Sequence, residues 1–405
     1  MSRLKALLRR ALTPTLAVVT ALLFGAIVIV VTDFENLSRL GTDPAGAIGG
    51  AIGGIFTGYG AMLTGALGDP GRFLAAIQTG SERDIAAAIR PITETLVAAG
   101  PLIFVGLGVA ISFRAGMFNI GGQGQIMMGG LAATIAVILL AGTMPAFILL
   151  LLGLLAATLA GGVFGFIPGF LKARTGAHEV ITTIMLNYIG QLIVFFALRS
   201  DTLRAAGSTS PVSKNLTPLA DVPILIPLQG IRLDWGFIVA LLMAVLVSWL
   251  LFRTTMGFEL RAAGFNMTAA RYAGMSAGGS MMLAMALSGA LAGMAGGFIV
   301  LGTVGQLTLD AHGGIGFTAI ALALLAGLRP SGIVVAAILF GALTTGGKTM
   351  GIVSGIPVDL LSFIMALVIM FVAAPGLIRA IWRVKVSKPP PEVASVTPVG
   401  PAEAT

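Results

Sequence analysis

The chain has 405 residues, of which 57% are hydrophobic and only 10% charged, and its mean hydropathy is +1.01. Soluble domains carry about 25% charged residues, which keep their surfaces hydrated, so this composition excludes a soluble enzyme. The absence of cysteine excludes disulfides and thiolate metal sites, and two histidines leave little for metal ligation, so we expect no metal and no other cofactor.

Uncharged apolar runs of roughly 15 to 25 residues recur along the chain, close to the length that crosses a hydrocarbon core of about 30 Å. They predict an all-α, polytopic membrane protein with ten transmembrane helices. The expected spans lie near residues 14–32, 95–112, 124–142, 146–170, 178–198, 236–252, 280–301, 315–328, 332–347 and 358–378. We expect one transmembrane domain over residues 1–387, followed by a disordered cytoplasmic tail over 388–405.

The uncharged segment 45–67 differs from these runs because glycine, rather than leucine or isoleucine, dominates it. Glycines weaken a helix and lower its hydropathy, so we favour an outer-face or re-entrant helix over an eleventh span. The sequence also suggests close helix packing, because glycines recur at every fourth position. These are Gly46, Gly50, Gly54 and Gly58.

The basic residues are distributed asymmetrically between the two sides that ten spans define. With the N-terminus in the cytoplasm, the inner segments hold 15 of the 24 Lys and Arg residues, and 12 of the 16 acidic residues lie outside. Basic residues accumulate in the cytoplasmic loops of membrane proteins. We therefore expect both termini in the cytoplasm, and the net charge of +8 needs no nucleic-acid partner.

A glycine-rich break interrupts the apolar stretch from Phe113 to Gly130. Backbone freed by such a break is tolerated at membrane depth only where protein or a water-filled cavity satisfies it. Transporters often build a substrate site from a broken helix. Three amides at the break are candidates to line a solute route, namely Asn119, Gln123 and Gln125. A tight turn capped by Asn119 accounts for that residue equally well.

A polar ridge marks the helix predicted near 178–198. The ridge comprises Glu179, Thr183, Asn187 and Gln191. These positions share one helix face, which cannot face lipid. Asn187 lies about 12 Å into the helix, near the bilayer midplane, and both a route-lining role and interhelical hydrogen bonding fit it. Glu179 lies near the inner boundary, where Lys172 or Arg174 can pair with it.

The long inner loop over residues 253–279 is too apolar for a disordered linker and too interrupted to span. Gly264 interrupts it. Asn266 is expected to cap a short helix from Met267 that ends at Gly274. A short surface helix of this kind is suited to a groove on another protein, and resting on lipid headgroups is the alternative.

Two apparent catalytic signals lack the context that their chemistry needs. Residues 342–349 fit a permissive phosphate-binding loop, but a genuine one joins a buried strand to a helix, whereas this one ends a membrane span. His178 and Glu179 are adjacent and point in different directions on a helix. Without paired carboxylates or a nucleophile elbow, the sequence indicates a chain that is not an enzyme.

Four longer blocks occur in order along the chain. They are PLIFVGLGVAISFRAGMFNIGGQGQ (101–125), HEVITTIMLNYI (178–189), ELRAAGFNMTAARYAGM (259–275) and GIGFTAIALALLAGLRPSGIVVAAILFGAL (314–343). They resemble the permease subunits of bacterial ABC importers of the branched-chain amino acid and simple-sugar class, in particular its nucleoside-type branch. Gln123 stands where such sequences more often have Glu, and His178 where they more often have Asn, so no charged role is carried over to position 123.

This resemblance implies a multi-subunit importer in the bacterial plasma membrane. Its other parts would be a separate cytoplasmic ABC ATPase that hydrolyses ATP, a second permease subunit, identical or paralogous, and an extracytoplasmic substrate-binding lipoprotein. The inner-loop helix resembles the coupling helix that contacts the ATPase. Its candidate contact residues are Glu259, Gly264, Asn266, Ala270, Arg271 and Gly274.

The nucleoside-type branch implies a nucleoside as the solute. By the same resemblance the route is lined by Asn119, Gln123, Gln125 and Asn187. Amides offer paired donors and acceptors to the edge of a base, but the same chemistry suits simple sugars, and branched-chain amino acids are a further substrate class. A stand-alone secondary transporter is the alternative function. It would place acidic residues at the midplane for ion coupling, where only Glu179 comes close.

Overall fold

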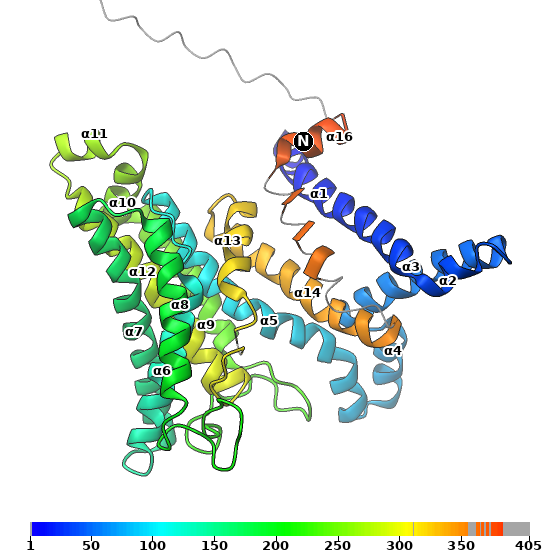
Figure 1. The fold of residues 1–405 in the computed structure, drawn as a ribbon, viewed down its shortest axis with the longest axis horizontal. Helices are drawn as coiled ribbons and strands as arrows, with labels where there is room; N and C mark the ends of the chain where they lie inside the picture. Colours follow the sequence, from blue (N-terminus) through cyan, green and yellow to red (C-terminus); the bar gives the residue numbers. More distant parts are fainter. Residues whose placement is uncertain are drawn as a thin grey trace, which may run out of the picture.

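The computed structural model describes residues 2–310, 312–354, 362–364, 366–367, 370–371 and 374–383. Almost all of this part of the chain is helical, and isolated β-bridges are its only extended pairings. The predicted all-α class is therefore confirmed (Figure 1). The span expected over 358–378 extends outside these residues, and the tail expected over 388–405 lies outside them altogether.

Helices follow one another along nearly the whole described chain. In order they are α1 (Ser2–Thr32), α2 (Phe34–Arg39), α3 (Pro44–Leu67), α4 (Pro70–Thr79), α5 (Glu82–Arg114), α6 (Gly122–Leu140), α7 (Ala146–Thr175), α8 (Glu179–Ala197), α9 (Trp235–Arg253), α10 (Thr255–Phe265), α11 (Met267–Tyr272), α12 (Ala277–Phe298), the π-helical turn η1 (Ile299–Thr303), α13 (Ile315–Leu325), α14 (Pro330–Ser354) and α16 (Pro375–Ile381). Within the described residues, nine segments are long and apolar enough to cross a membrane, namely α1 from Thr15, α3, α5 to α9, α12 with η1, and α14. The chain is a polytopic membrane protein.

Eight of the ten predicted spans coincide with these segments. The prediction was wrong for 315–328, because α13 covers only Ile315–Leu325 and is too short to cross. Gly314 and Gly327 adopt the left-handed backbone conformation that favours glycine, and they interrupt the apolar run on both sides of the helix. An apolar run of spanning length therefore folds here as half a span.

The glycine-rich segment 45–67 forms one unbroken helix, α3. Its 24 residues and mean hydropathy of 1.3 give it the length and composition of a span, which our preference for a re-entrant or outer-face helix did not anticipate. The expected glycine contact is absent at Gly54, where an added Cβ would meet nothing within 4 Å. Instead α3 packs on α14 through Gly65, where an added Cβ would overlap Thr349.

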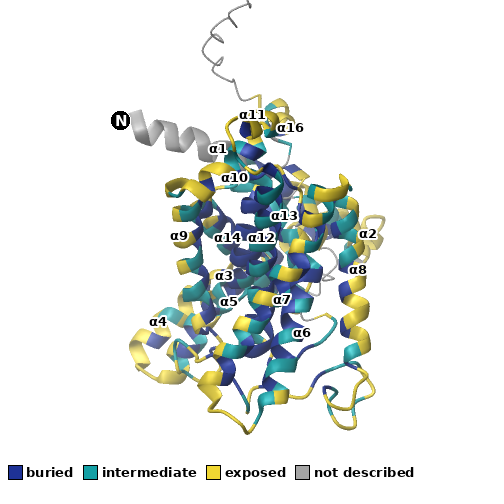
Figure 2. Ribbon diagram, turned by 90° about the vertical axis from the view of Figure 1, so that its left-hand side faces the viewer, coloured by how far each residue is buried: buried dark blue, intermediate teal, exposed yellow. Residues whose placement is uncertain are grey.

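Helices α5 and α12 form the centre of the molecule, and 72% of the most apolar window of each is buried (Figure 2). Helices α6 and α7 pack on α12, while α9, α13 and α14 pack on α5. The backbones of α7 and α12 touch: an added Cβ at Gly161 would overlap the carbonyl oxygen of Gly289, and one at Gly293 would overlap that of Ala157. Small residues of this kind let membrane helices approach closely.

Helices α1 and α16 lie near the two ends of the described chain and pack against each other. The Trp382 indole Nε1 donates a hydrogen bond to the Thr20 hydroxyl at 2.8 Å. In Figure 1 both helices reach the end of the molecule where α11 lies. The chain therefore starts and leaves its described part on the same side as α10 and α11.

The segment 342–349, which fits a phosphate-binding loop, lies inside α14 and is helical throughout. Within a helix interior the backbone N–H groups bond to the preceding turn, so they are not free to cradle a phosphate. This geometry agrees with the expectation that the segment is not a nucleotide site.

Candidate substrate cavity

The predicted break is present between α5, which ends at Arg114, and α6, which begins at Gly122. Asn119 closes the turn between them, because its Oδ1 accepts a hydrogen bond from the Gly121 N–H at 2.9 Å. Its Nδ2 donates to Gln125 Oε1 at 3.0 Å and to Ser288 Oγ at 2.8 Å. Asn119 and Gln125 are each only 1% exposed, so these two predicted route residues form a buried polar cluster.

Asn187 of α8 bonds directly to the broken backbone. Its Oδ1 accepts from the Gly124 N–H at 2.8 Å, and its Nδ2 donates to the Ile120 carbonyl oxygen at 2.9 Å. The turn before α6 frees these backbone groups, and buried backbone groups need partners. The interhelical interpretation of Asn187 is therefore correct in geometry. Three of the four residues of the predicted ridge face the protein, since Glu179, Thr183 and Asn187 are buried, whereas Gln191 is exposed.

The N-terminus of α13 meets the N-terminus of α6 at the same place. The Gly316 N–H donates to Gln123 Oε1 at 3.2 Å. An added Cβ at Gly316 would overlap the backbone of Gln123, so glycine is required for this approach. A short half-span helix thus ends against the broken helix, as in the substrate sites of transporters with discontinuous helices.

A cavity of about 660 Å³ opens beside this meeting point, between α6, α8, α13 and the segment before α13. Of the four predicted route residues, Gln123 and Asn187 line it, whereas Asn119 and Gln125 do not. Its polar wall also includes Gln191 of α8. The volume lies within the range of about 300–1,000 Å³ that is usual for small-molecule sites.

Four further lining residues have aromatic or ionisable side chains and were not predicted from the sequence as route residues. They are Tyr188, Asp310, His312 and Phe317. Tyr188 and Phe317 are 61% and 53% exposed, so both bring accessible aromatic side chains to the cavity. The glycine pair at 313–314 interrupts the chain before α13, as Gly121 and Gly122 do before α6, and it is the sequence signal that marks this second half of the site.

His312 stands out in this wall because its Nδ1 is buried and has no hydrogen-bond partner among the described residues. A buried polar atom without a partner costs about 1–3 kcal/mol. A polar ligand or a water in the cavity would satisfy it. The cavity therefore combines aromatic faces, amides, a carboxylate and an unsatisfied ring nitrogen.

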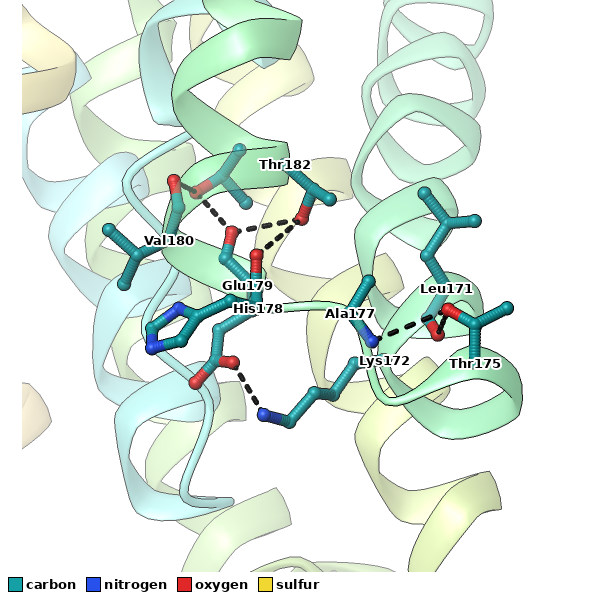
Figure 3. A network of polar contacts seen from close by, with 9 residues as sticks. Leu171, Lys172, Thr175, Ala177, His178, Glu179, Val180 and Thr182 are labelled. Carbon is teal, nitrogen blue, oxygen red and sulfur yellow. Dashed lines mark hydrogen bonds and ion pairs between the residues drawn. The ribbon is translucent and has the colours of Figure 1, made fainter.

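The N-terminal end of α8 is held by an ion pair between Lys172 Nζ and Glu179 Oε2 at 2.9 Å (Figure 3). The predicted pairing of Glu179 with Lys172 is confirmed. Arg174 instead lies over the Phe170 ring, 6.0 Å from its centroid. The ion pair between Lys172 and Glu179 joins α7 to α8 across the short connection at 176–178. Glu179 is thus paired and is the first residue of α8, whereas an ion-coupled transporter would need a carboxylate at the midplane.

Helices α10 and α11 protrude together at one end of the molecule (Figure 1). The predicted helix from Met267 is present as α11, with Asn266 Oδ1 accepting from the Ala269 N–H at 3.0 Å and Gly274 in a left-handed conformation just beyond it. Sequence reasoning missed α10, a second helix in the same loop. Of the six candidate contact residues, four are exposed, namely Glu259, Asn266, Arg271 and Gly274, whereas Gly264 is half-buried.

Ala270 requires a correction, because it is only 3% exposed and faces the chain itself. It therefore cannot be a surface contact of α11. The most exposed large side chains of this loop are Phe265 and Tyr272, at 95% and 91%. Neither was among the predicted contact residues, although both flank the predicted cap and stop of the helix.

Gly264 lies against the turn that precedes the substrate cavity. An added Cβ at Gly264 would overlap the Arg114 carbonyl oxygen and lie 2.7 Å from the Gly116 nitrogen. Gly116 itself has a φ of +73°, which glycine adopts without strain. The protruding loop and the helix break are thus in direct backbone contact.

The family of the branched-chain amino acid transport system permease component matches residues 92–373. The chain belongs to this permease family. It is an ABC transporter permease, a transport component rather than an enzyme. The family segment contains the helix break, the cavity and the protruding loop.

Relatives with assigned names cover most of the chain. The guanosine ABC transporter permease protein NupP of Bacillus subtilis is 36% identical over 91% of this chain and 94% of its own length. The nucleoside ABC transporter permease protein NupB of Lactococcus lactis is 34% identical over 72% of this chain and 81% of its own. The glucose ABC transporter permease protein TsgB13 of Haloferax volcanii is 34% identical over 69% and 75%. No solved structure gives a significant match.

Proposed function

We propose that the chain is the permease of an ATP-driven nucleoside importer in a bacterial plasma membrane, with both termini in the cytoplasm. Two of the relatives are named for guanosine or nucleoside transport. The observation that carries the proposal is the cavity of about 660 Å³ at the meeting point of α6, α8 and α13. Its lining combines the groups that a nucleoside requires.

The chemistry of the cavity matches both halves of a nucleoside. Tyr188 and Phe317 present aromatic faces on which a base can stack, a contact worth about 1–3 kcal/mol per base. Gln123 and Gln191 supply amide donors and acceptors to the edge of the base. Asp310 supplies a carboxylate that accepts hydrogen bonds from ribose hydroxyls. Asn119 and Gln125 act at one remove, by holding the turn that carries Gln123.

A second permease subunit, identical or paralogous, is expected to close this cavity. Polar groups at membrane depth do not face lipid, yet Gln191 is exposed and lines the cavity. The surface around it on α8 is strongly apolar, with Leu192 65% and Phe196 77% exposed. An extracytoplasmic substrate-binding lipoprotein would deliver the solute to the opposite end of the molecule from α11.

The ATPase chain is expected to dock on α10 and α11, where Phe265 and Tyr272 are almost fully exposed. Movement there would reach the cavity through Gly264 and the turn at Gly116, because these backbones are in contact. The same turn leads directly into the start of α6, where Gln123 lies. This arrangement supplies a short mechanical connection between ATP hydrolysis and the substrate cavity.

A simple sugar is the second candidate substrate, because the glucose permease relative is 34% identical over 69% of this chain. Asp310 and the amides suit sugar hydroxyls as well as ribose. The two aromatic faces distinguish the candidates, since a planar base gains more from stacking than a sugar ring does.

The experiment is uptake of radiolabelled guanosine by cells that express the chain with its ATPase, partner permease and binding protein. Phe317→Ala and Tyr188→Ala should each lower uptake by about tenfold, as expected for the loss of one stacked base. Phe147→Ala is the matched control, because Phe147 is an exposed phenylalanine of α7 that does not line the cavity. Unchanged guanosine uptake in both cavity variants, or uptake of glucose in its place, would overturn the proposal.

ATPase docking is tested with two neighbouring substitutions on α11. Ala269 is exposed, so Ala269→Glu should abolish co-purification of the ATPase and uptake while leaving the thermal unfolding of the permease unchanged. Ala270→Glu places a charge at a buried position and should lower the unfolding temperature as well. If Ala269→Glu retains both the ATPase and uptake, the docking assignment fails and a stand-alone secondary transporter becomes the better description.

A further inference from the structure

A second large hollow lies away from the substrate cavity, in the groove between α9 and α14 near the end where α10 begins. Its volume is about 620 Å³, and Val245, Trp249 and Phe252 of α9 form much of its apolar wall. Arg253 and Ser331 line it where α9 ends and α14 begins. The groove is therefore apolar along its length and basic at one end.

Three more arginines gather at that basic end. The guanidinium carbons of Arg114 and Arg261 lie 5.0 Å and 5.3 Å from the centroid of the Phe252 ring. Arg114 is also close enough to Arg261 and Arg329 for their positive charges to repel it. Arg329 precedes Ser331 of the groove by two residues. Arg114 and Arg261 thus lie over one aromatic ring, Arg329 lies near Arg114, and Arg253 follows Phe252 in the chain, so α5, α9, α10 and the α13–α14 connection each contribute one arginine to this end of the groove.

These positive charges lack acidic partners within the described part of the chain. The ion pairs found there join Lys172 to Glu179 and Arg232 to Glu94. Arg114 Nε donates to the Leu328 carbonyl oxygen at 2.8 Å, and Arg261 Nε to that of Gly257 at 3.3 Å, so both bond to neutral acceptors. No side-chain hydrogen bond is present for Arg253 or Arg329, and both are exposed.

Clustered like charges destabilise one another unless an anion neutralises them. The cluster stands at the end of three membrane helices, which is the depth of the lipid headgroups. Guanidinium groups bind phosphate with paired hydrogen bonds, and basic pockets between membrane helices bind anionic lipid headgroups. An apolar groove that continues from such a cluster accommodates an acyl chain.

We propose that this groove holds an anionic phospholipid of the leaflet on the α10 side. Its phosphate binds Arg253 and Arg329, and one acyl chain lies along Val245 and Trp249. The bound lipid screens the repulsion among the four arginines. It thereby stabilises the junction of α9, α10 and α14, which is close to the loop that protrudes from the membrane.

The test measures thermal unfolding of the purified, delipidated full-length chain in a neutral detergent. Phosphatidylglycerol should raise the unfolding temperature in a saturable manner, whereas phosphatidylcholine and inorganic phosphate should not. A soluble anion site would respond to inorganic phosphate as strongly as to phosphatidylglycerol. That result would overturn the lipid assignment, because it would leave no role for the groove.

Two independent variants separate the headgroup contact from the acyl-chain contact. The double variant Arg253→Gln with Arg329→Gln should weaken the phosphatidylglycerol response by about tenfold, equivalent to roughly 1.4 kcal/mol. Val245→Trp should fill the groove and weaken the response with every arginine in place, and it should fold normally because Val245 is 69% exposed. The Val245→Trp result decides the question alone if the double variant does not fold.

Arg174→Gln is the matched control. Arg174 also lies near the end of a membrane helix and over an aromatic ring, that of Phe170, but it does not line the groove. It should respond to phosphatidylglycerol as the unmodified chain does. An equal response from the control, the double variant and Val245→Trp would show that the lipid acts elsewhere.

Discussion

Two neighbouring helix contacts, α7 on α12 and α8 on α6, bring helices together with different chemistry. Where α7 meets α12, glycine backbones touch without intervening side chains, as at Gly161 and Gly293. Where α8 meets α6, Asn187 spans the interface with two hydrogen bonds to backbone at Ile120 and Gly124. The first contact is dispersive and the second is polar.

The difference follows from the state of the backbone on each side. Helices α7 and α12 are continuous at their contact, so their backbone groups are hydrogen-bonded within each helix. The two helices are therefore held together by van der Waals contact at close approach. The turn before α6 leaves backbone groups unpaired, and Asn187 pairs them. The cavity lies beside the polar contact. A membrane helix must therefore be broken before its surroundings offer hydrogen bonds to a solute.

The largest expected effect comes from adding one methyl group to the glycine contact. Gly293→Ala would drive the new Cβ into the Ala157 carbonyl oxygen, and backbone on both sides leaves nothing that can move aside. We expect overpacking severe enough to prevent recovery of a monodisperse folded protein, measured by size-exclusion chromatography in detergent.

Gly162→Ala is the control on the facing helix. An added Cβ at Gly162 would lie 3.4 Å from the Ala290 Cβ, an ordinary van der Waals contact. This variant should fold and unfold as the unmodified chain does. Equal recovery of Gly293→Ala and Gly162→Ala would remove the distinction between a backbone contact and a merely glycine-rich helix.

Asn187→Leu should have the next largest effect, because it leaves the Ile120 carbonyl and the Gly124 N–H without their partner. Each unpaired group costs about 2 kcal/mol, so the variant should fold but unfold at a lower temperature and lose uptake. Gln191→Leu separates the two effects, because Gln191 is exposed on the same ridge and lines the cavity, so this variant should keep its unfolding temperature while losing uptake. An Asn187→Leu variant with normal stability and normal uptake would show that the hydrogen bonds of Asn187 do not hold the turn before α6 in place.

A smaller effect on stability is expected at Asp234, whose buried carboxyl group packs against Gly302. Asp234 is 8% exposed, its Oδ1 accepts from the Gly236 N–H at 2.8 Å, and an added Cβ at Gly302 would overlap its other oxygen. Burial raises the pKa of Asp234 from 3.8 to about 6, opposed by the Gly236 hydrogen bond. The folded state thus retains the proton longer than the unfolded chain does.

The sign of the pH dependence follows from that raised pKa. The stability associated with protonated Asp234 is complete below pH 3.8 and is lost as the pH rises through about 6. Asp234→Asn keeps an oxygen acceptor without an ionisable group, so it should stabilise the protein at neutral pH by up to about 3 kcal/mol. The gain should vanish as the pH falls through 3.8.

Asp69→Asn provides the comparison for this pH series. Asp69 accepts from the Gly71 N–H at 2.8 Å in the same capping geometry, but it is exposed. Its substitution should give no gain in unfolding temperature at neutral pH. A gain at neutral pH that is equal in Asp69→Asn and Asp234→Asn would exclude burial as its cause.

The sequence allowed accurate prediction where the signal is local. Glycines at 121 and 122 locate the helix break, the capping geometry of Asn266 locates α11, and the four-residue spacing places Asn187 on a buried face. Each of these features depends on residues within one or two helical turns. Helical periodicity and capping chemistry are strong over that distance.

Features that depend on distant residues were not predictable in this way. Asp310 and His312 lie more than a hundred residues beyond Asn187, and only the folded chain brings them to one cavity. Ala270 was predicted to be a surface contact and Phe265 was not, but the docking of α10 and α11 on the bundle buries the first and leaves the second exposed. The half-span α13 was missed because hydropathy does not register the left-handed glycines at its ends.

The contact between Gly264 and the turn at Gly116 also constrains how this permease can be recombined with its relatives. Main chain meets main chain there, and even one extra carbon atom would collide with the Arg114 carbonyl oxygen. A hybrid that receives the 254–276 loop from another permease must therefore receive the 114–116 turn from the same donor. The two segments are far apart in the chain, yet they form a single exchangeable module whose halves have to match.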